Sequence, residues 1–190
     1  MIVQISPRWV NAALDLSSES AVATTQPVGD PPRNEPVGEI VVRPAKISDM
    51  RDVEPLIRHF AEHNLMLPKG YDDLARNFRE FIVACDESGR VAACGALRVY
   101  GEGLAEVCSL AVDPPLQRAG LGRQVVVGLL ESARDLGIAR VFALTLNPAF
   151  FGRLGFETVP KDEFPQKVWA DCRSCPKLHA CDEIAVALDI

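Results

Sequence analysis

One stretch of the chain decides the fold: Leu110-Ala-Val-Asp-Pro-Pro-Leu-Gln-Arg-Ala-Gly-Leu-Gly-Arg123. Its apolar start predicts the end of a β-strand, two prolines end that strand, and two glycines stand immediately before a predicted helix. Glycine lets the backbone approach a ligand closely, and the first helical turn offers N–H donors at the positive end of the helix dipole. Because Arg118 and Arg123 add positive charge, the stretch predicts a phosphate-binding loop. The alternative is an ordinary glycine-rich turn with two solvated arginines.

The sequence on both sides of this loop predicts a mixed sheet. Residues 104–112 predict the strand that enters the loop, and residues 82–86 and 91–100 predict a hairpin before it. After the loop we expect a long helix that ends at Gly137, followed by a strand over residues 141–146. This strand–helix–strand succession predicts a right-handed parallel crossover beside antiparallel hairpins. The apolar face of the helix consists of Leu121, Val125, Leu129, Ala133 and Leu136.

Weaker patterns predict the remaining elements. Residues 40–43 and 184–188 predict strands, and residues 148–154 predict a short helix before an extended segment. Ser48 or Asp49 is expected to cap a first helix. Its apolar stripe comprises Met50, Val53, Ile57 and Phe60, and a second helix is expected to carry Tyr71, Leu74, Phe78 and Phe81.

Composition excludes several classes of function. The formal net charge of −6, from 20 Lys and Arg against 26 Asp and Glu, argues against a general nucleic-acid or anionic-membrane surface. No apolar run approaches the ~20 residues that span a bilayer, and no secretory signal is recognisable, so the chain is predicted to be cytoplasmic. Residues 1–38 hold five of the 14 prolines and predict a flexible tail. This tail has three interpretations: a regulatory arm, a disordered extension or a start codon assigned too early.

Two motifs resemble landmarks of the GNAT superfamily of N-acetyltransferases. Gln117-Arg-Ala-Gly-Leu-Gly122 is similar to the acetyl-CoA signature Gln/Arg-x-x-Gly-x-Gly/Ala, and 147–156 resembles the short helix that ends in Leu-Gly-Phe. The resemblance implies an α/β fold: a twisted mixed sheet of about six to seven strands flanked by about four helices, with acetyl-CoA as co-substrate. The cofactor-binding residues that it implies are Leu110, Ala111, Val112, Gln117, Arg118, Ala119, Gly120, Leu121, Gly122, Arg123, Asn147 and Phe151.

Four further segments resemble the short, stand-alone bacterial N-acetylglutamate synthases: 95–98, 104–112, 140–145 and 164–172. This resemblance implies an acetyltransferase domain over residues 39–190 that acts in arginine biosynthesis. Its substrate would be a small molecule, L-glutamate, whose α-amine receives the acetyl group. A homodimer is compatible with the sequence.

The reaction implied by the resemblance needs an oxyanion donor, a base and an acid. In the family, a strand backbone N–H near Leu110 or Ala111 serves the oxyanion. Glu106 is the carboxylate of its strand, shares a face with Cys108 and Leu110 by alternation, and resembles the family's general base. A structural ion pair with Arg98 is the alternative role for Glu106. Many relatives carry a tyrosine that acts as the general acid at the position of Phe151. In this chain, solvent or another group would therefore protonate the departing CoA thiolate.

Glutamate carries two carboxylates, so its pocket is expected to offer cationic groups. Arg98 and Lys167 are the candidates for this role, and Ser109 adds a hydroxyl at the same end of the strand. Lys69 is a weaker fourth candidate. Each of these residues would otherwise be a surface charge or a polar residue at the edge of the core.

The C-terminal segment 169–183 contains Cys172, Cys175, His179 and Cys181. These residues have the types and number of a Cys3His zinc site, but the short spacing between His179 and Cys181 is unusual for one. Reduced thiols and a redox switch through a Cys172–Cys175 disulfide are the alternatives, so no metal ligands are assigned.

Two other functions fit the sequence. One is a GNAT acetyltransferase for another small amine or a protein N-terminus, and the other is a non-catalytic, acetyl-CoA-binding regulatory module. The pair Arg98 and Lys167 argues against a polyamine acceptor, and Glu106 argues against a non-catalytic module.

Overall fold

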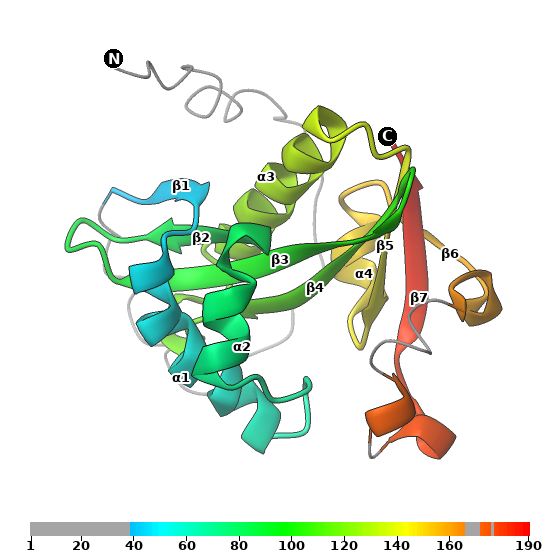
Figure 1. Cartoon of the computed structure of the whole chain (residues 1–190), viewed down its shortest axis with the longest axis horizontal. Coiled ribbons are helices and arrows are strands. Elements are labelled where there is room, and N and C mark those ends of the chain that lie inside the picture. The colour runs from blue at the N-terminus through cyan, green and yellow to red at the C-terminus, as the bar shows by residue number, and fades with distance from the viewer. Residues whose placement is uncertain (1–38, 166–171, 176) are drawn as a thin grey trace, which may run out of the picture.

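The fold is built on one mixed sheet of seven strands, as a computed structural model shows for residues 39–165, 172–175 and 177–190 (Figure 1). The predicted tail 1–38 and Lys167 lie outside these described residues. The strand order is β1-β2-β3-β4-β5-β7-β6. The strands are β1 (Val41–Pro44), β2 (Phe81–Cys85), β3 (Val91–Gly101), β4 (Leu104–Val112), β5 (Arg140–Thr145), β6 (Glu157–Thr158) and β7 (Ile184–Asp189). The α-helices are α1 (Met50–Glu62), α2 (Tyr71–Arg76), α3 (Leu121–Asp135) and α4 (Pro148–Gly152).

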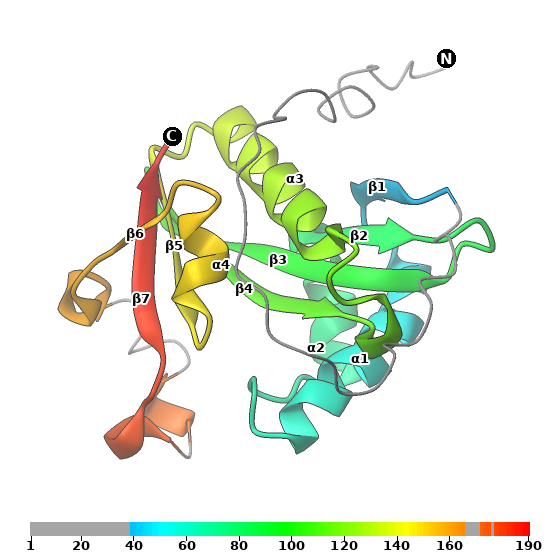
Figure 2. The same cartoon turned by 180° about the vertical axis from the view of Figure 1, so that it is seen from behind.

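The predicted fold class is confirmed. Strands β1 to β4 pair antiparallel, whereas β4 and β5 pair parallel through the crossover helix α3. Helices α1 and α2 cover one face of the sheet, and α3 and α4 cover the other (Figures 1 and 2). Among the described residues, no helix is long and apolar enough to span a membrane.

The apolar spacing of α3 correctly predicts its buried face. Leu121, Val125, Leu129 and Ala133 belong to the core between α3 and the sheet. Leu136 was expected on the same face but is 64% exposed. Helix α3 ends at Asp135, and the positive φ of Gly137 (72°) turns the chain away, so Leu136 leaves the apolar stripe.

The predicted second helix is wrong beyond Arg76. The Nδ2 group of Asn77 donates to the carbonyl oxygen of Asp73 at 3.0 Å, and the chain turns there. Phe78 then lies in a short 3-10 turn, and Phe81 begins β2. The apolar spacing of a helix therefore extends in the sequence beyond the end of the helix. Phe81 fits this spacing, but it is a buried residue of β2 that pairs with Ala96.

The predicted cap of the first helix also differs. Asp49 occupies the N-cap position of α1, but its carboxylate makes no capping hydrogen bond. It accepts instead from Nη1 of Arg43 at 2.6 Å and from the backbone N–H of Lys46 at 2.6 Å. Burial would raise the pKa of Asp49, but these hydrogen bonds outweigh that effect and lower it. Asp49 therefore ties β1 to the start of α1.

Candidate active site

A cleft opens where β4 and β5 part. Parallel pairing joins only residues Leu104–Glu106 of β4 to residues 140–142 of β5. Beyond these pairs both strands line one cleft with a volume of about 1320 Å³. On one face of the sheet the cleft is bounded by the loop before α3 and by α4 (Figure 2), and on the other by the α1–α2 loop and the C-terminal segment. The separation of β4 from β5 thus joins the two faces of the sheet in one cleft.

A β-bulge at Ser109 shapes this wall of the cleft. Cys94 pairs with Ala111 but Ala96 pairs with Cys108, so two residues of β4 oppose one residue of β3. Ser109 takes up the extra length with a positive φ of 51°. The expectation that Leu110 shares a face with Glu106 is therefore wrong, because the bulge turns Leu110 toward the core under α3.

Gly95 lies opposite the bulge, where a side chain has no room. A Cβ atom at this position would lie 2.9 Å from Cγ1 of Val125 and 3.1 Å from Cδ1 of Leu129. We expect Gly95→Ala to lower the free energy of unfolding by about 1–3 kcal/mol, because a β-branched side chain in a packed core cannot move aside. Urea denaturation measures the loss.

Gly152→Ala is the matched control for this variant, since a Cβ atom at Gly152 meets nothing within 4 Å. It should leave the urea midpoint unchanged or raise it slightly. A Gly95→Ala protein as stable as the wild type would contradict the close approach of β3 to α3.

The loop before α3 presents backbone donors to the cleft. Gly120 has a positive φ of 82° and forms the N-cap of α3. The first hydrogen bond of the helix runs from Gln124 N to Gly120 O at 3.1 Å, so the N–H groups of residues 121–123 precede the helical ladder. Of the predicted loop residues, Ala119 is exposed but does not line the cleft. The cleft wall includes Gln117, Arg118, Gly120, Leu121, Gly122 and Arg123.

Two cations in this loop suit an anionic ligand. Arg118 and Arg123 are exposed at the cleft, and neither forms a salt bridge with any residue that the structure describes. In a chain with a net charge of −6, two cations without a salt-bridge partner among the described residues favour an external anion as partner. Together with the helix N-terminus, they make this loop suitable for phosphate groups.

Residues at the start of α4 and within it also line the cleft. The Oδ1 atom of Asn147 accepts from Phe150 N at 3.2 Å and caps the helix, and Asn147 itself lines the cleft. Phe151 also reaches the cleft but is only 4% exposed. Its ring packs edge-on against those of Phe150 and Phe156. Phe151 therefore supports the wall mainly as a core residue.

Glu106 is a buried carboxylate on the wall of the cleft. It is 2% exposed, lines the cleft and lies opposite Arg98 in the β3–β4 register. The hydroxyl group of Tyr100 donates to Oε2 of Glu106 at 2.9 Å. No sequence pattern assigns Tyr100 a role, although strand alternation places it on the same side of β3 as Arg98, two residues away.

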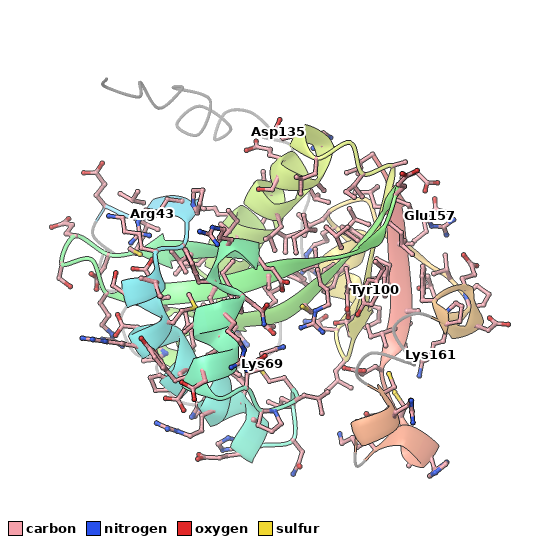
Figure 3. All side chains as sticks on the ribbon, viewed as in Figure 1. Arg43, Lys69, Tyr100, Asp135, Glu157 and Lys161 are labelled. Carbon is pink, nitrogen blue, oxygen red and sulfur yellow. The ribbon has the colours of Figure 1, made fainter. Side chains whose placement is uncertain are left out.

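The predicted acceptor residues are only partly brought together. Ser109 lines the cleft, but Arg98 does not, and its Nε lies 4.0 Å from Oε2 of Glu80. Two other lysines do line it: Lys69, the weaker fourth candidate, on the α1–α2 loop, and Lys161, which no sequence pattern singled out, near the C-terminal segment (Figure 3). No periodic signal marks a loop lysine as part of a cleft.

The C-terminal segment bounds the cleft next to Lys161. Nζ of Lys177 donates to the carbonyl oxygen of Asn64 at 3.2 Å and thereby joins this segment to the α1–α2 loop. Nζ of Lys161 lies 3.4 Å from Sγ of Cys181. Cys172, Cys175 and Cys181 line the cleft, and the structure shows no disulfide between cysteines of the described residues.

The structure brings no zinc-binding cluster together among the described residues of this segment. All four candidate ligands belong to the part of the chain that the structure describes. Within that part, no group of three or more His, Cys, Asp or Glu side chains could hold a metal ion.

Comparison with known proteins identifies the family. The profile of the acetyltransferase (GNAT) family matches residues 47–156. An uncharacterised N-acetyltransferase of Chlorobaculum tepidum is 38% identical over 80% of this chain and 97% of its own length. An amino-acid acetyltransferase of Mycobacterium tuberculosis is 38% identical over 70% of this chain and 78% of its own. That of Neisseria meningitidis is 31% identical over 71% of this chain, which matches only 31% of that longer protein.

Solved structures agree with these sequence relatives. A Mycobacterium tuberculosis protein in complex with CoA has a TM-score of 0.68 and 32% identity, and the match covers 79% of this chain and 99% of that one. An N-acetylglutamate synthase of Neisseria gonorrhoeae with coenzyme A and N-acetyl-glutamate has a TM-score of 0.71 and 27% identity. That match covers 80% of this chain and 35% of the other. With more than half of its length matched by the family profile, the chain belongs to the GNAT family of acetyltransferases.

Proposed function

We propose that this acetyltransferase moves an acetyl group from acetyl-CoA to the α-amine of L-glutamate. The observation that carries the proposal is the split between β4 and β5, which connects the cationic loop before α3 to the buried carboxylate of Glu106. The relatives named amino-acid acetyltransferase and N-acetylglutamate synthase support an amino acid as acceptor.

The proposed reaction needs two reactants side by side. Glu106 takes a proton from the ammonium group of the acceptor, and the free amine attacks the thioester carbonyl. Backbone N–H groups near Leu110 and Ala111, on the stretch of β4 that has left β5, donate to the developing oxyanion. The C–N bond forms, the nitrogen releases its second proton to water, the C–S bond breaks, and the thiolate leaves. The thiolate of a thiol with an ordinary pKa of about 8.5 is a weak base, so water can protonate it in place of the hydroxyl group that Phe151 lacks.

For the acceptor we retain Arg98, Ser109 and Lys167 as proposed ligands of the glutamate carboxylates. Ser109 is supported by its place on the cleft wall. Lys69 and Lys161 join them, because both line the cleft. Two carboxylates require at least two such cations or helix N-termini.

A panel of acceptors tests the proposed substrate. We expect the purified protein to release CoA from acetyl-CoA faster with L-glutamate than with L-glutamine, L-aspartate, L-lysine or spermidine. Loss of the hydrogen bonds to one carboxylate should cost at least tenfold in kcat/KM. A thiol-reactive dye measures CoA release, and mass spectrometry identifies the acetylated product. A polyamine or lysine as the best acceptor would overturn the glutamate assignment and leave the acetyltransferase activity in place.

A further inference from the structure

Tyr100 is placed to act on the base of the proposed reaction without touching the substrate. Its hydroxyl donates to Oε2 of Glu106 at 2.9 Å. Glu106 lines the cleft, but Tyr100 does not. Any effect of Tyr100 on the reaction would therefore pass through the carboxylate of Glu106.

An aromatic cluster holds the tyrosine in place. The ring of Tyr100 lies 5.8 Å from that of Phe142, measured between centroids. Phe142 in turn stacks on Phe164 with 4.0 Å between centroids and 3° between ring planes. Phe142 is fully buried and is also the β5 partner of Glu106. The position of the phenol is therefore set by packed rings, which makes its hydroxyl a fixed donor.

Charged and titratable side chains occupy neighbouring positions on β3, β4 and β5. Arg98 lies opposite Glu106 on β3 and has Glu80 as an acidic neighbour at 4.0 Å. Cys108 lies two residues further along β4, and Arg140 lies on β5 two residues before Phe142. Nη2 of Arg140 donates to Oε2 of Glu163 at 2.8 Å. Among these groups, Tyr100 meets Glu106 as a neutral hydrogen-bond donor.

We infer that Tyr100 is a positioning residue that orients the Glu106 carboxylate and favours its ionised form, ready to accept the proton of the ammonium group. This inference rests on the proposed function, in which Glu106 is the base. A donor hydrogen bond stabilises the charged form of a carboxylate, and a fixed donor also restricts its rotation.

The test compares Tyr100→Phe with Tyr71→Phe. The chain has two tyrosines, and Tyr71 is 41% exposed on α2, so its variant is a matched control. We expect Tyr100→Phe to lower kcat about 3- to 10-fold and to move the acidic limb of the pH–rate profile upward by about one pH unit. KM for acetyl-CoA should stay within twofold, and Tyr71→Phe should match the wild type.

A double-variant cycle separates positioning from general structure. In a Glu106→Gln background, Tyr100→Phe should cause less than a twofold further loss, because the group on which it acts is already gone. A fully multiplicative loss, or an acidic limb that stays in place, would overturn the inference.

A spectroscopic titration tests the contact without any activity. In Tyr71→Phe protein, Tyr100 is the one remaining tyrosine, so phenolate absorbance reports it alone. Its midpoint should fall by about one pH unit when Glu106→Gln removes the carboxylate. An unchanged midpoint would overturn the contact. If the shift occurs but no acceptor is acetylated, the proposed function fails while the contact stands.

Discussion

Replacing Glu106 by glutamine is expected to lower kcat by roughly 10²- to 10⁴-fold, which is the usual contribution of a general base. Glutamine has nearly the same shape, so the buried position and the contact with Tyr100 can persist without the charge. KM for acetyl-CoA should change little, because the phosphate-binding loop belongs to a different part of the cleft. Steady-state kinetics with saturating acetyl-CoA measures the loss.

Glu102→Gln is the control for this variant. Glu102 is exposed in the turn between β3 and β4, so its charge is removed from the same hairpin without entering the cleft. A loss below about threefold for Glu106→Gln, with the protein still folded, would assign Glu106 to a structural pair with Arg98. In that case the variant should instead be less stable in urea.

Removing both arginines of the loop is expected to raise KM for acetyl-CoA by about 100-fold. Each exposed, charged hydrogen bond to phosphate contributes about 1.5 kcal/mol, or roughly tenfold, and two such losses combine in Arg118→Ala with Arg123→Ala. KM for the acceptor should stay within a few-fold. Because exposed charges are screened, the difference from the wild type should shrink as ionic strength rises.

Arg134→Ala controls for the loss of an exposed arginine from the same helix region outside the cleft. Arg134 is exposed in the last turn of the same helix, α3, and does not line the cleft. Its variant should bind acetyl-CoA like the wild type. If the double variant did the same, the loop would be the ordinary glycine-rich turn that its sequence also allows, and phosphate recognition would lie elsewhere.

The sequence by itself determined the fold class and the location of the cationic, glycine-containing loop before α3. Both depend on local patterns: prolines end β4, Gly120 begins α3, and the apolar period of α3 predicts its buried face. The position of Glu106 on β4 also follows from one strand read alone. Such features need only neighbouring residues, so they are visible without knowing what packs against them.

Tertiary structure alone decided how the cleft is assembled. The bulge at Ser109 depends on pairing between β3 and β4, and it turned Leu110 to the other face of the sheet. The hydroxyl of Tyr100 meets Glu106 across two strands, and Lys177 joins segments 113 residues apart in the chain. Phe81 was likewise expected in a helix but is the first residue of β2. A local period cannot predict these outcomes, because each is set by the free energy of contacts between residues distant in the sequence, which overrides a weak local preference.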